Sequence, residues 1–425
     1  MSDEFAVFVS PLGTDAGSGA KTDPLLSIAS AITAAAAQQK VVIACSTDKA
    51  VFTTALALSG DVTARVYGGF DCATWVHGDA RTLIAPDQRG PALTLEGVSG
   101  ALVFEDLEFR SLDALDGEGE SSIAAVVSKS DGVAFSRVLF AAGKGGAGRD
   151  GAEVEPYDGT ALAGNDAMGS VGAAPRETTE CGCDTAGGEG GNASAGINGD
   201  PGLPDYGGGK GGTGGKDCSE GGAGSTGAPA PTDTPFGTGA ETHGTLTGTT
   251  WQPTPGQPGS TGKAGQGGGG GGGQGKAGGG AGGGGACGGC GGKGGEPGLG
   301  GGSSIGLLLV DSEVTFRDAL IKTDNAGAGG DGGPGQDGQE GGLGGIHTAG
   351  GCPGGAGGDG APGSRGGGGA GGLSVGILFR GLAPSLDGVT ISTGARGVGG
   401  SGSTSSATSD DGLDGDNPET FDADS

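Results

Sequence analysis

Aromatic and other apolar residues are scarce in this chain of 425 residues. Only 33% of the residues are hydrophobic and 4% are aromatic, whereas glycine alone supplies 110 residues. Such a composition is typical of low-complexity sequence and cannot bury one large core. The aliphatic residues are nevertheless gathered into a few blocks, so we expect a core that is divided into small parcels rather than missing.

Basic residues are also few. The chain has 22 Lys and Arg against 50 Asp and Glu, a formal net charge of −28. Clustered Lys and Arg carry the binding of nucleic acids and of anionic membrane surfaces, so the composition argues against both kinds of partner. The charge fits a soluble, mutually repelling surface and leaves carboxylates available for divalent cations.

Long apolar runs are absent as well. No run approaches the length of about 18 residues that a membrane-spanning helix needs. The first residues, MSDEFAVFVSPLG, lack a basic stretch followed by an apolar one, so no secretory signal is recognisable there.

Four apolar blocks share one pattern. Each has an apolar run, a short polar break, an alternation of apolar and polar residues, a second short strand and then, in most cases, glycine; the blocks are 91–111, 121–151, 303–333 and 373–402. Alternation places one row of side chains inward and the next outward, and only stacked turns bury the inner row. The repeat therefore predicts an all-β fold, a right-handed parallel β-helix interrupted by long insertions at one fixed point.

A short helix is predicted near the N-terminus. Ile28, Ala31, Ile32 and Ala35 form one apolar stripe at helical spacing. We expect this helix to cap the open first coil of the β-helix, with a plain surface helix as the alternative.

The N-terminal third also carries a family resemblance. VFVSPLGTDAGSGAKTDPLLSIASAI, followed by VVIAC, VTARVYGGFDCATW and TLIAP, resembles the opening of bacterial cell-surface proteins with a pectin-lyase-like right-handed parallel β-helix, especially the glycine-rich ones of myxobacterial type. The resemblance covers residues 5–140 and the two later coils, and it implies the fold but little about activity. It also implies that Cys45 and Cys72 lie on adjacent coils and are bridged.

Glycine recurs at every third residue in two runs, Gly329 to Gly344 and Gly351 to Gly372. A period of three fits a polyproline-II-type helix, which has no internal hydrogen bonds. Without Cβ atoms such helices can bond laterally, so we expect a bundle of glycine-rich polyglycine or polyproline-II-type helices. The runs 329–346 and 351–372 would be antiparallel rods of roughly 55–65 Å joined by HTAG. A flexible glycine linker is the alternative.

These patterns divide the chain into six predicted parts. They are the N-terminal cap with the first coils (1–142), a glycine-rich insertion (143–302), a β-helix coil (303–324), a glycine-rich hairpin (325–372), the last coil (373–399) and an acidic tail (400–425).

The even number of cysteines favours disulfides formed in an oxidising compartment. In the predicted rod Cys287 and Cys290 are about 9 Å apart and cannot pair with each other. The eight candidates for disulfides are Cys45, Cys72, Cys181, Cys183, Cys218, Cys287, Cys290 and Cys352. A zinc site is the alternative, although its cysteine spacing is poor and the three histidines, His77, His243 and His347, are isolated.

No catalytic pattern stands out. The predicted coil faces carry eleven charged residues: Glu105, Asp106, Glu108, Arg110, Asp311, Glu313, Arg317, Asp318, Lys322, Arg380 and Asp387. They do not form the paired Asp and Gly-His-Gly pattern of a polygalacturonase, so no catalytic residue and no cofactor is predicted. Calcium is an alternative, because GGAGRD (145–150), GGPGQD (332–337) and GGAGGD (354–359) match the start of a calcium-binding β-roll repeat but lack its apolar residue.

We therefore expect an extracellular or cell-surface structural protein that is not an enzyme. It would assemble into a filament or another homo-oligomer, because the last coil has no cap and invites a second copy head to tail, or it would act in adhesion, with surface polysaccharide as partner. Net charge opposes assembly unless salt or divalent cations screen it, and the alternative is a monomer whose open end is covered by the acidic tail or by residues 1–8. The alternatives are a carbohydrate-binding or carbohydrate-active β-helix, which needs a carboxylate-lined cleft, and an ice-binding face. The mixed row Asp331, Pro334, Asp337, Glu340 and Leu343 disfavours the last.

Overall fold

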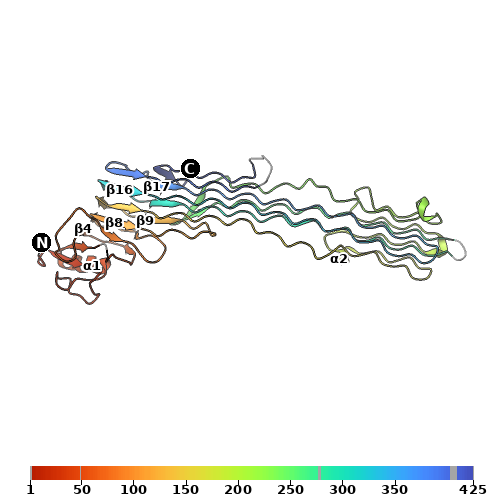
Figure 1. Cartoon of the computed structure of the whole chain (residues 1–425), viewed down its shortest axis with the longest axis horizontal. Coiled ribbons are helices and arrows are strands. Elements are labelled where there is room, and N and C mark those ends of the chain that lie inside the picture. Colours follow the sequence, from red (N-terminus) through yellow and green to blue (C-terminus); the bar gives the residue numbers. More distant parts are fainter. Residues whose placement is uncertain (1, 48, 276–278, 403–408, 425) are drawn as a thin grey trace.

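The computed structural model describes residues 2–47, 49–275, 279–402 and 409–424. The molecule is elongated: the strands gather at one end, and the glycine-rich segments extend from them as a long array of parallel lines (Figure 1). Residues 276–278 of the predicted glycine-rich insertion, and residues 403–408 and 425 of the predicted acidic tail, lie outside the described residues.

Three large parallel sheets contain most of the strands. Sheet A has the order β1 (Ala6–Val9), β2 (Val41–Cys45), β4 (Ala64–Phe70), β7 (Leu102–Glu105), β10 (Val133–Ser136) and β15 (Val314–Arg317). Sheet B has the order β18 (Val389–Ser392), β16 (Ala319–Lys322), β11 (Leu139–Ala141), β8 (Leu107–Arg110) and β5 (Thr82–Ile84). Sheet C has the order β19 (Thr420–Asp422), β17 (Ser374–Arg380), β14 (Ser304–Val310), β9 (Ser122–Ser128), β6 (Leu93–Glu96) and β3 (Leu56–Ser59).

From β3 to β16 the chain visits sheets C, A and B in the same order each time, and equivalent residues of successive repeats lie opposite one another. Val133, for example, faces Leu102 on one side and Val314 on the other. The same register stacks the buried rings of Phe104 and Phe135 at 5.8 Å between centroids. The core is thus built from inward rows of apolar side chains, as the alternation in the sequence predicts.

The longest helix among the described residues has a different role from the one predicted. Helix α1 (Ile28–Gln38) begins at Ser27, whose side chain accepts a hydrogen bond from the N–H of Ser30, and its apolar stripe is buried. It lies in the chain between β1 and β2, which pair in parallel. Two parallel strands need a crossover connection, so α1 is that crossover and not an N-terminal cap.

The glycine-rich segments do not form a bundle of helices. Apart from α1, the described residues contain as helical elements only α2 (Thr178–Cys181) and the single turns η1 (Ala193–Ala195) and η2 (Cys218–Glu220), and the structure is 5% helical and 25% strand. The expected fold class, a right-handed parallel β-helix with an N-terminal capping helix and an inserted helix bundle, is therefore wrong in this form. The parallel sheets, which close no barrel, are compatible with a β-helix.

Backbone bonds between neighbouring segments, rather than within one segment, build the glycine array, which comprises the described parts of 143–302 and 325–372. Gly259, Gly262 and Gly265 donate N–H bonds to the carbonyls of Gly295, Gly292 and Gly289 over 2.8–2.9 Å. The segment 354–372 is bonded in the same antiparallel way to 327–345, again at every third residue. The period of three in the sequence is thus the period of lateral hydrogen bonding.

Close approach of neighbouring backbones explains why that third residue is glycine. A Cβ atom at Gly332 would overlap the carbonyl oxygen of Gly366, and one at Gly338 would overlap the carbonyl oxygen of Gly360. Any larger residue would push the two segments apart and break their bonds.

A two-stranded antiparallel sheet was not predicted. Strands β12 (Gly244–Thr247) and β13 (Thr250–Pro253) form a hairpin within the glycine-rich insertion. Leu246 and Trp251 of this hairpin pack on the outer face of sheet C, and the Trp251 Nε1–H donates to Ser303 Oγ at 3.0 Å.

Candidate functional site

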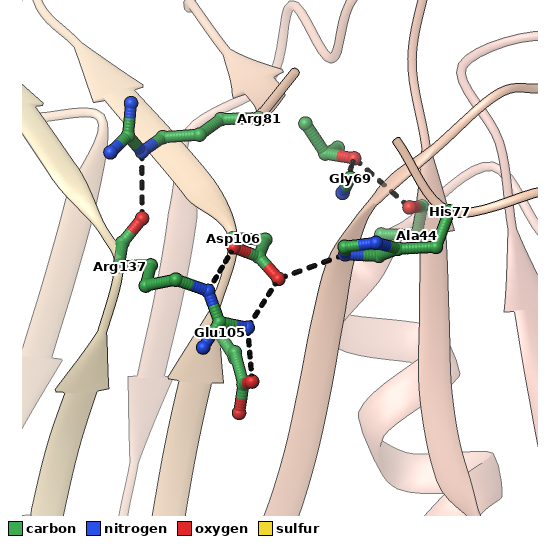
Figure 2. A network of polar contacts seen from close by, with 8 residues as sticks. Ala44, Gly69, His77, Arg81, Glu105, Asp106 and Arg137 are labelled. Atoms are coloured by element: carbon green, nitrogen blue, oxygen red, sulfur yellow. Dashed lines mark hydrogen bonds and ion pairs between the residues drawn. The ribbon is translucent and has the colours of Figure 1, made fainter. Parts of the chain in front are cut away.

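A connected group of charged side chains lies at the turn from sheet A to sheet B. Asp106 and Arg137 each adopt a left-handed conformation, with φ of 57° and 50°, at equivalent corners of successive repeats. Because β7 and β10 pair in register, the two corners are neighbours. The loop between β4 and β5 brings His77 and Arg81 to the same corner (Figure 2).

Arg137 is held by two carboxylates. Its Nε–H donates to Asp106 Oδ1 and one terminal nitrogen donates to Asp106 Oδ2, both at 2.7 Å, while the same nitrogen also contacts Glu105. His77 Nε2 lies 3.0 Å from Asp106 Oδ2, and the Arg81 Nε–H donates to the Arg137 carbonyl at 2.6 Å. We call Glu105, Asp106, Arg137 and His77 the corner cluster (Figure 2).

The corner cluster keeps Asp106 ionised. Burial opposes ionisation of this carboxyl, but hydrogen bonds from Arg137 and His77 and their charges outweigh it, so the pKa of Asp106 lies below its usual value. Hydrogen bonds to Asp106 and Glu105 raise the pKa of Arg137. A carboxylate with a lowered pKa and committed oxygens is a weak general base, so the arrangement serves as a clamp between repeats more readily than as an acid–base pair.

A hollow of about 290 Å³ lies beside the corner cluster, and its lining includes Asp71, Asp79 and Arg81. Thr82 supports its wall by donating to the Ala44 carbonyl at 2.9 Å and accepting the Gly69 N–H at 3.0 Å. Hydrogen bonds from the side chain and backbone of Thr74 lower the pKa of Asp71. Across the described ranges, no group of three or more His, Cys, Asp or Glu side chains is placed to hold a metal ion.

The structure separates most of the charged residues predicted on the coil faces. Only Glu105 and Asp106 join the corner cluster. Three of the other placements involve contacts or a hollow: Glu108 pairs with Arg110 on β8, Arg380 donates to the Leu246 carbonyl, and Asp311 and Glu313 line a hollow after β14. Asp318 occupies the next left-handed corner. The remaining three are exposed: Arg317 on β15, Lys322 on β16 and Asp387 before β18.

Sequence reasoning missed Arg137 and treated His77 as isolated. Arg137 follows β10 at the position where Asp106 follows β7, so aligning the repeats for their corner residues would have identified it. Nothing in the sequence around His77 indicates its partner, because the loop after β4 reaches Asp106 only through the fold.

All eight cysteines are paired. The bonds are Cys45–Cys72, as the family resemblance implied, Cys181–Cys287, Cys183–Cys290 and Cys218–Cys352. The last three join segments of the glycine array, so the alternative of a zinc site at these thiols is not supported. Four disulfides indicate an oxidising environment.

Replacing Arg137 with methionine is expected to lower the free energy of unfolding at pH 7 by about 1–2 kcal/mol, since the cluster is only partly buried. The pKa of Asp106 is lowered in the folded state, so its contribution is present above the pKa of the unfolded chain and is lost as pH falls through the folded pKa. The free energy of unfolding, measured with urea at pH 7 and again in acid, should therefore fall less between these two conditions for Arg137→Met than for the wild type.

Arg110→Met is the matched control. Arg110 pairs with Glu108 on the exposed face of one strand, where an ion pair contributes about 0–1 kcal/mol. Equal losses for the two variants would show that the corner cluster contributes no more than a surface pair.

Within the described parts of the chain, no helix is both long enough and apolar enough to cross a bilayer. None of the family models, curated proteins or solved structures compared with the chain matches it. The resemblance to glycine-rich cell-surface proteins therefore stays a prediction.

Proposed function

We propose that this chain is an extracellular structural protein in which the glycine array acts as a stiff rod that carries the three parallel sheets. The observation that supports the proposal best is the lateral hydrogen bonding of the array at every third residue. A linker of free glycine would have no such network, and ordering glycine costs more entropy than ordering any other residue.

Polar side chains inside the array complete the network. Gln266 is buried; its Oε1 accepts the N–H of Gly208 at 2.9 Å and its Nε2 donates to the Gly202 carbonyl at 3.2 Å. Gln336 bridges two segments in the same way, from Lys293 to Glu155. Buried amides with their partners in place favour one rigid arrangement over many.

The acidic residues also have a structural part in the proposal. Asp150 accepts the N–H of Asp331 at 2.8 Å, and the Asp331 carboxylate accepts the N–H of Ser401 at 2.7 Å. Asp166 and Asp359 accept backbone N–H groups of the same glycine-rich hairpin. Carboxylates that cap the outer N–H groups of the array account for part of the net charge without any bound cation.

An adhesive or spacing role is favoured over a filament. Residues 19–25 cover the outer edge of β1, where Phe8 donates to the Gly19 carbonyl at 2.8 Å and accepts the N–H of Leu25 at 3.0 Å. Head-to-tail pairing of strands therefore lacks a receiving edge at the N-terminal end of sheet A.

Carbohydrate binding is a second candidate. A groove of about 510 Å³ runs between the β12–β13 hairpin and sheet C, lined by Glu118, Glu120, Thr94, Gln252 and Trp251 among others. Carboxylates, hydroxyls and an amide along one groove suit a sugar. Binding to neutral and acidic polysaccharides, measured by affinity electrophoresis, tests this candidate, and a Gln252→Ala variant should weaken any binding found.

Immunogold labelling of intact cells of the source organism tests the proposed function. We expect label on the outside of intact cells and, for the purified oxidised protein, elongated single particles of constant length by electron microscopy. Label that requires permeabilised cells, or compact particles, would contradict the proposal.

A further inference from the structure

The last repeat leaves sheet A unfinished. Among the residues that the structure describes, strand β15 pairs with β10 on one side only and is the final strand of its sheet. The Glu313 N–H donates to the Ser130 carbonyl at 3.0 Å, and the Arg317 carbonyl accepts the Arg137 N–H at 2.7 Å. The N–H and C=O groups of successive residues in a strand point to opposite sides. Because those of Glu313 and Arg317 face β10, the N–H and C=O groups of Val314 and Phe316 face the open edge.

The segment 381–388 is the part of the chain that corresponds to the next strand of sheet A. Register pairs Val310 with Arg380 before this segment and Ala319 with Val389 after it, so it matches 311–318 residue for residue. In the described structure it is nevertheless a loop and not a strand.

The sequence of the segment explains why it does not pair. Ser312 is buried, and its hydroxyl accepts the N–H of Ser130 at 3.0 Å and donates to the Val310 carbonyl at 2.8 Å. The equivalent residue is Leu382, which cannot make these bonds and is 61% exposed. Leu386, in the place of Phe316, is also exposed.

Between β15 and this loop lies a groove that we call the edge groove. One hollow of about 340 Å³ and another of about 400 Å³ share Ser312, Glu313 and Leu382, so the two adjoin along the groove. The charged residues along it are four acids and one base: Asp131, Asp311, Glu313, Asp387 and Lys129.

We propose that the edge groove binds an extended, basic peptide segment of another protein, which adds to sheet A as a strand beside β15. The open backbone edge selects an extended chain, Leu382 and Pro384 in the lining offer apolar contacts to its side chains, and the acidic lining selects Lys or Arg. A second copy of this chain is disfavoured because its net charge is −28 and its own β1 edge is covered.

Fluorescence anisotropy with labelled hexapeptides tests the proposal on the full, oxidised chain. The probe is acetyl-KVTVKV-amide; acetyl-EVTVEV-amide and a form of the probe methylated at every backbone amide are the comparisons. We expect the probe to bind and each comparison to bind at least about tenfold more weakly, because one lacks the charge and the other the strand hydrogen bonds.

Charge reversal of the exposed Glu313 and Asp387 provides the variant. Glu313→Lys with Asp387→Lys should invert the preference, so that the acidic peptide binds better than the probe. Glu96→Lys, an exposed reversal on β6 outside the groove, should change nothing.

Three results would overturn the proposal. Equal binding of the methylated peptide would reduce the interaction to surface charge. Absence of binding together with a monomeric mass would leave the groove without the proposed partner. A concentration-dependent dimer dispersed by the double reversal would show that a second copy occupies it. None of these results bears on the stiffness of the glycine array, so the proposed function can stand or fall separately.

Discussion

Replacing Gly338 with alanine is expected to lower the free energy of unfolding by about 3 kcal/mol, because the added methyl group overlaps a backbone carbonyl that cannot rotate away. The carbonyl is that of Gly360, which lies on the adjacent segment and whose own N–H donates to the Gln339 carbonyl at 2.9 Å. Urea unfolding should show a lower midpoint, and hydrogen exchange should be faster across 354–372 as well as at the mutated position.

Gly78→Ala is the control with the same chemical change. A Cβ atom at Gly78 meets no atom within 4 Å, and its φ is not in the left-handed region. The control should be close to neutral. Equal behaviour of the two variants would show that the array is not closely packed and would remove the main support for a stiff rod.

Removing two neighbouring disulfides together is expected to be far more damaging than removing either one. Cys181–Cys287 and Cys183–Cys290 close loops of almost the same length, with sequence separations of 106 and 107 residues. Loss of both opens that loop in the unfolded chain, which the chain-entropy relation values at about 5 kcal/mol. With only one removed, the other still closes the loop, so the loss should be less than half of that value.

The comparison uses Cys181→Ala with Cys287→Ala, the equivalent change at Cys183 and Cys290, and the four changes combined, each measured by denaturant unfolding without reductant. Cys45→Ala with Cys72→Ala is a reference with a separation of 27 residues, for which the same relation gives about 3.5 kcal/mol. Additive losses from the two adjacent bonds would mean that each stabilises the folded array directly rather than through the unfolded chain.

The intervals between residues in the sequence predicted those parts of the structure in which one contact recurs at a fixed interval. The interval of three between glycines is the interval of lateral hydrogen bonding, and the alternation of residues such as Val133 and Phe135 is the inward row of sheet A. Both patterns repeat along the chain because the same contact repeats in space.

Features that depend on which segments become neighbours were not predictable in this way. The stripe of α1 shows a buried helix, but only the pairing of β1 with β2 makes that helix a crossover. The hairpin at 244–253 was missed inside a glycine-rich stretch, although the alternation in TLTGTTW, with Gly248 at a left-handed φ of 61°, carries a signal for it. The corner cluster joins residues from three repeats, so no single stretch contains it.

Lateral bonding at every third residue also restricts how such a molecule can change its length during evolution. A three-residue duplication in two bonded segments preserves the phase and simply lengthens the array, whereas a single inserted residue moves a side chain into each position where a neighbouring backbone passes. Length is therefore expected to vary among descendants of this gene in steps of three codons per segment. Cys181–Cys287 and Cys183–Cys290 fix how their segments align, so a three-residue insertion in this part of the array must lie outside the residues that these two disulfides join.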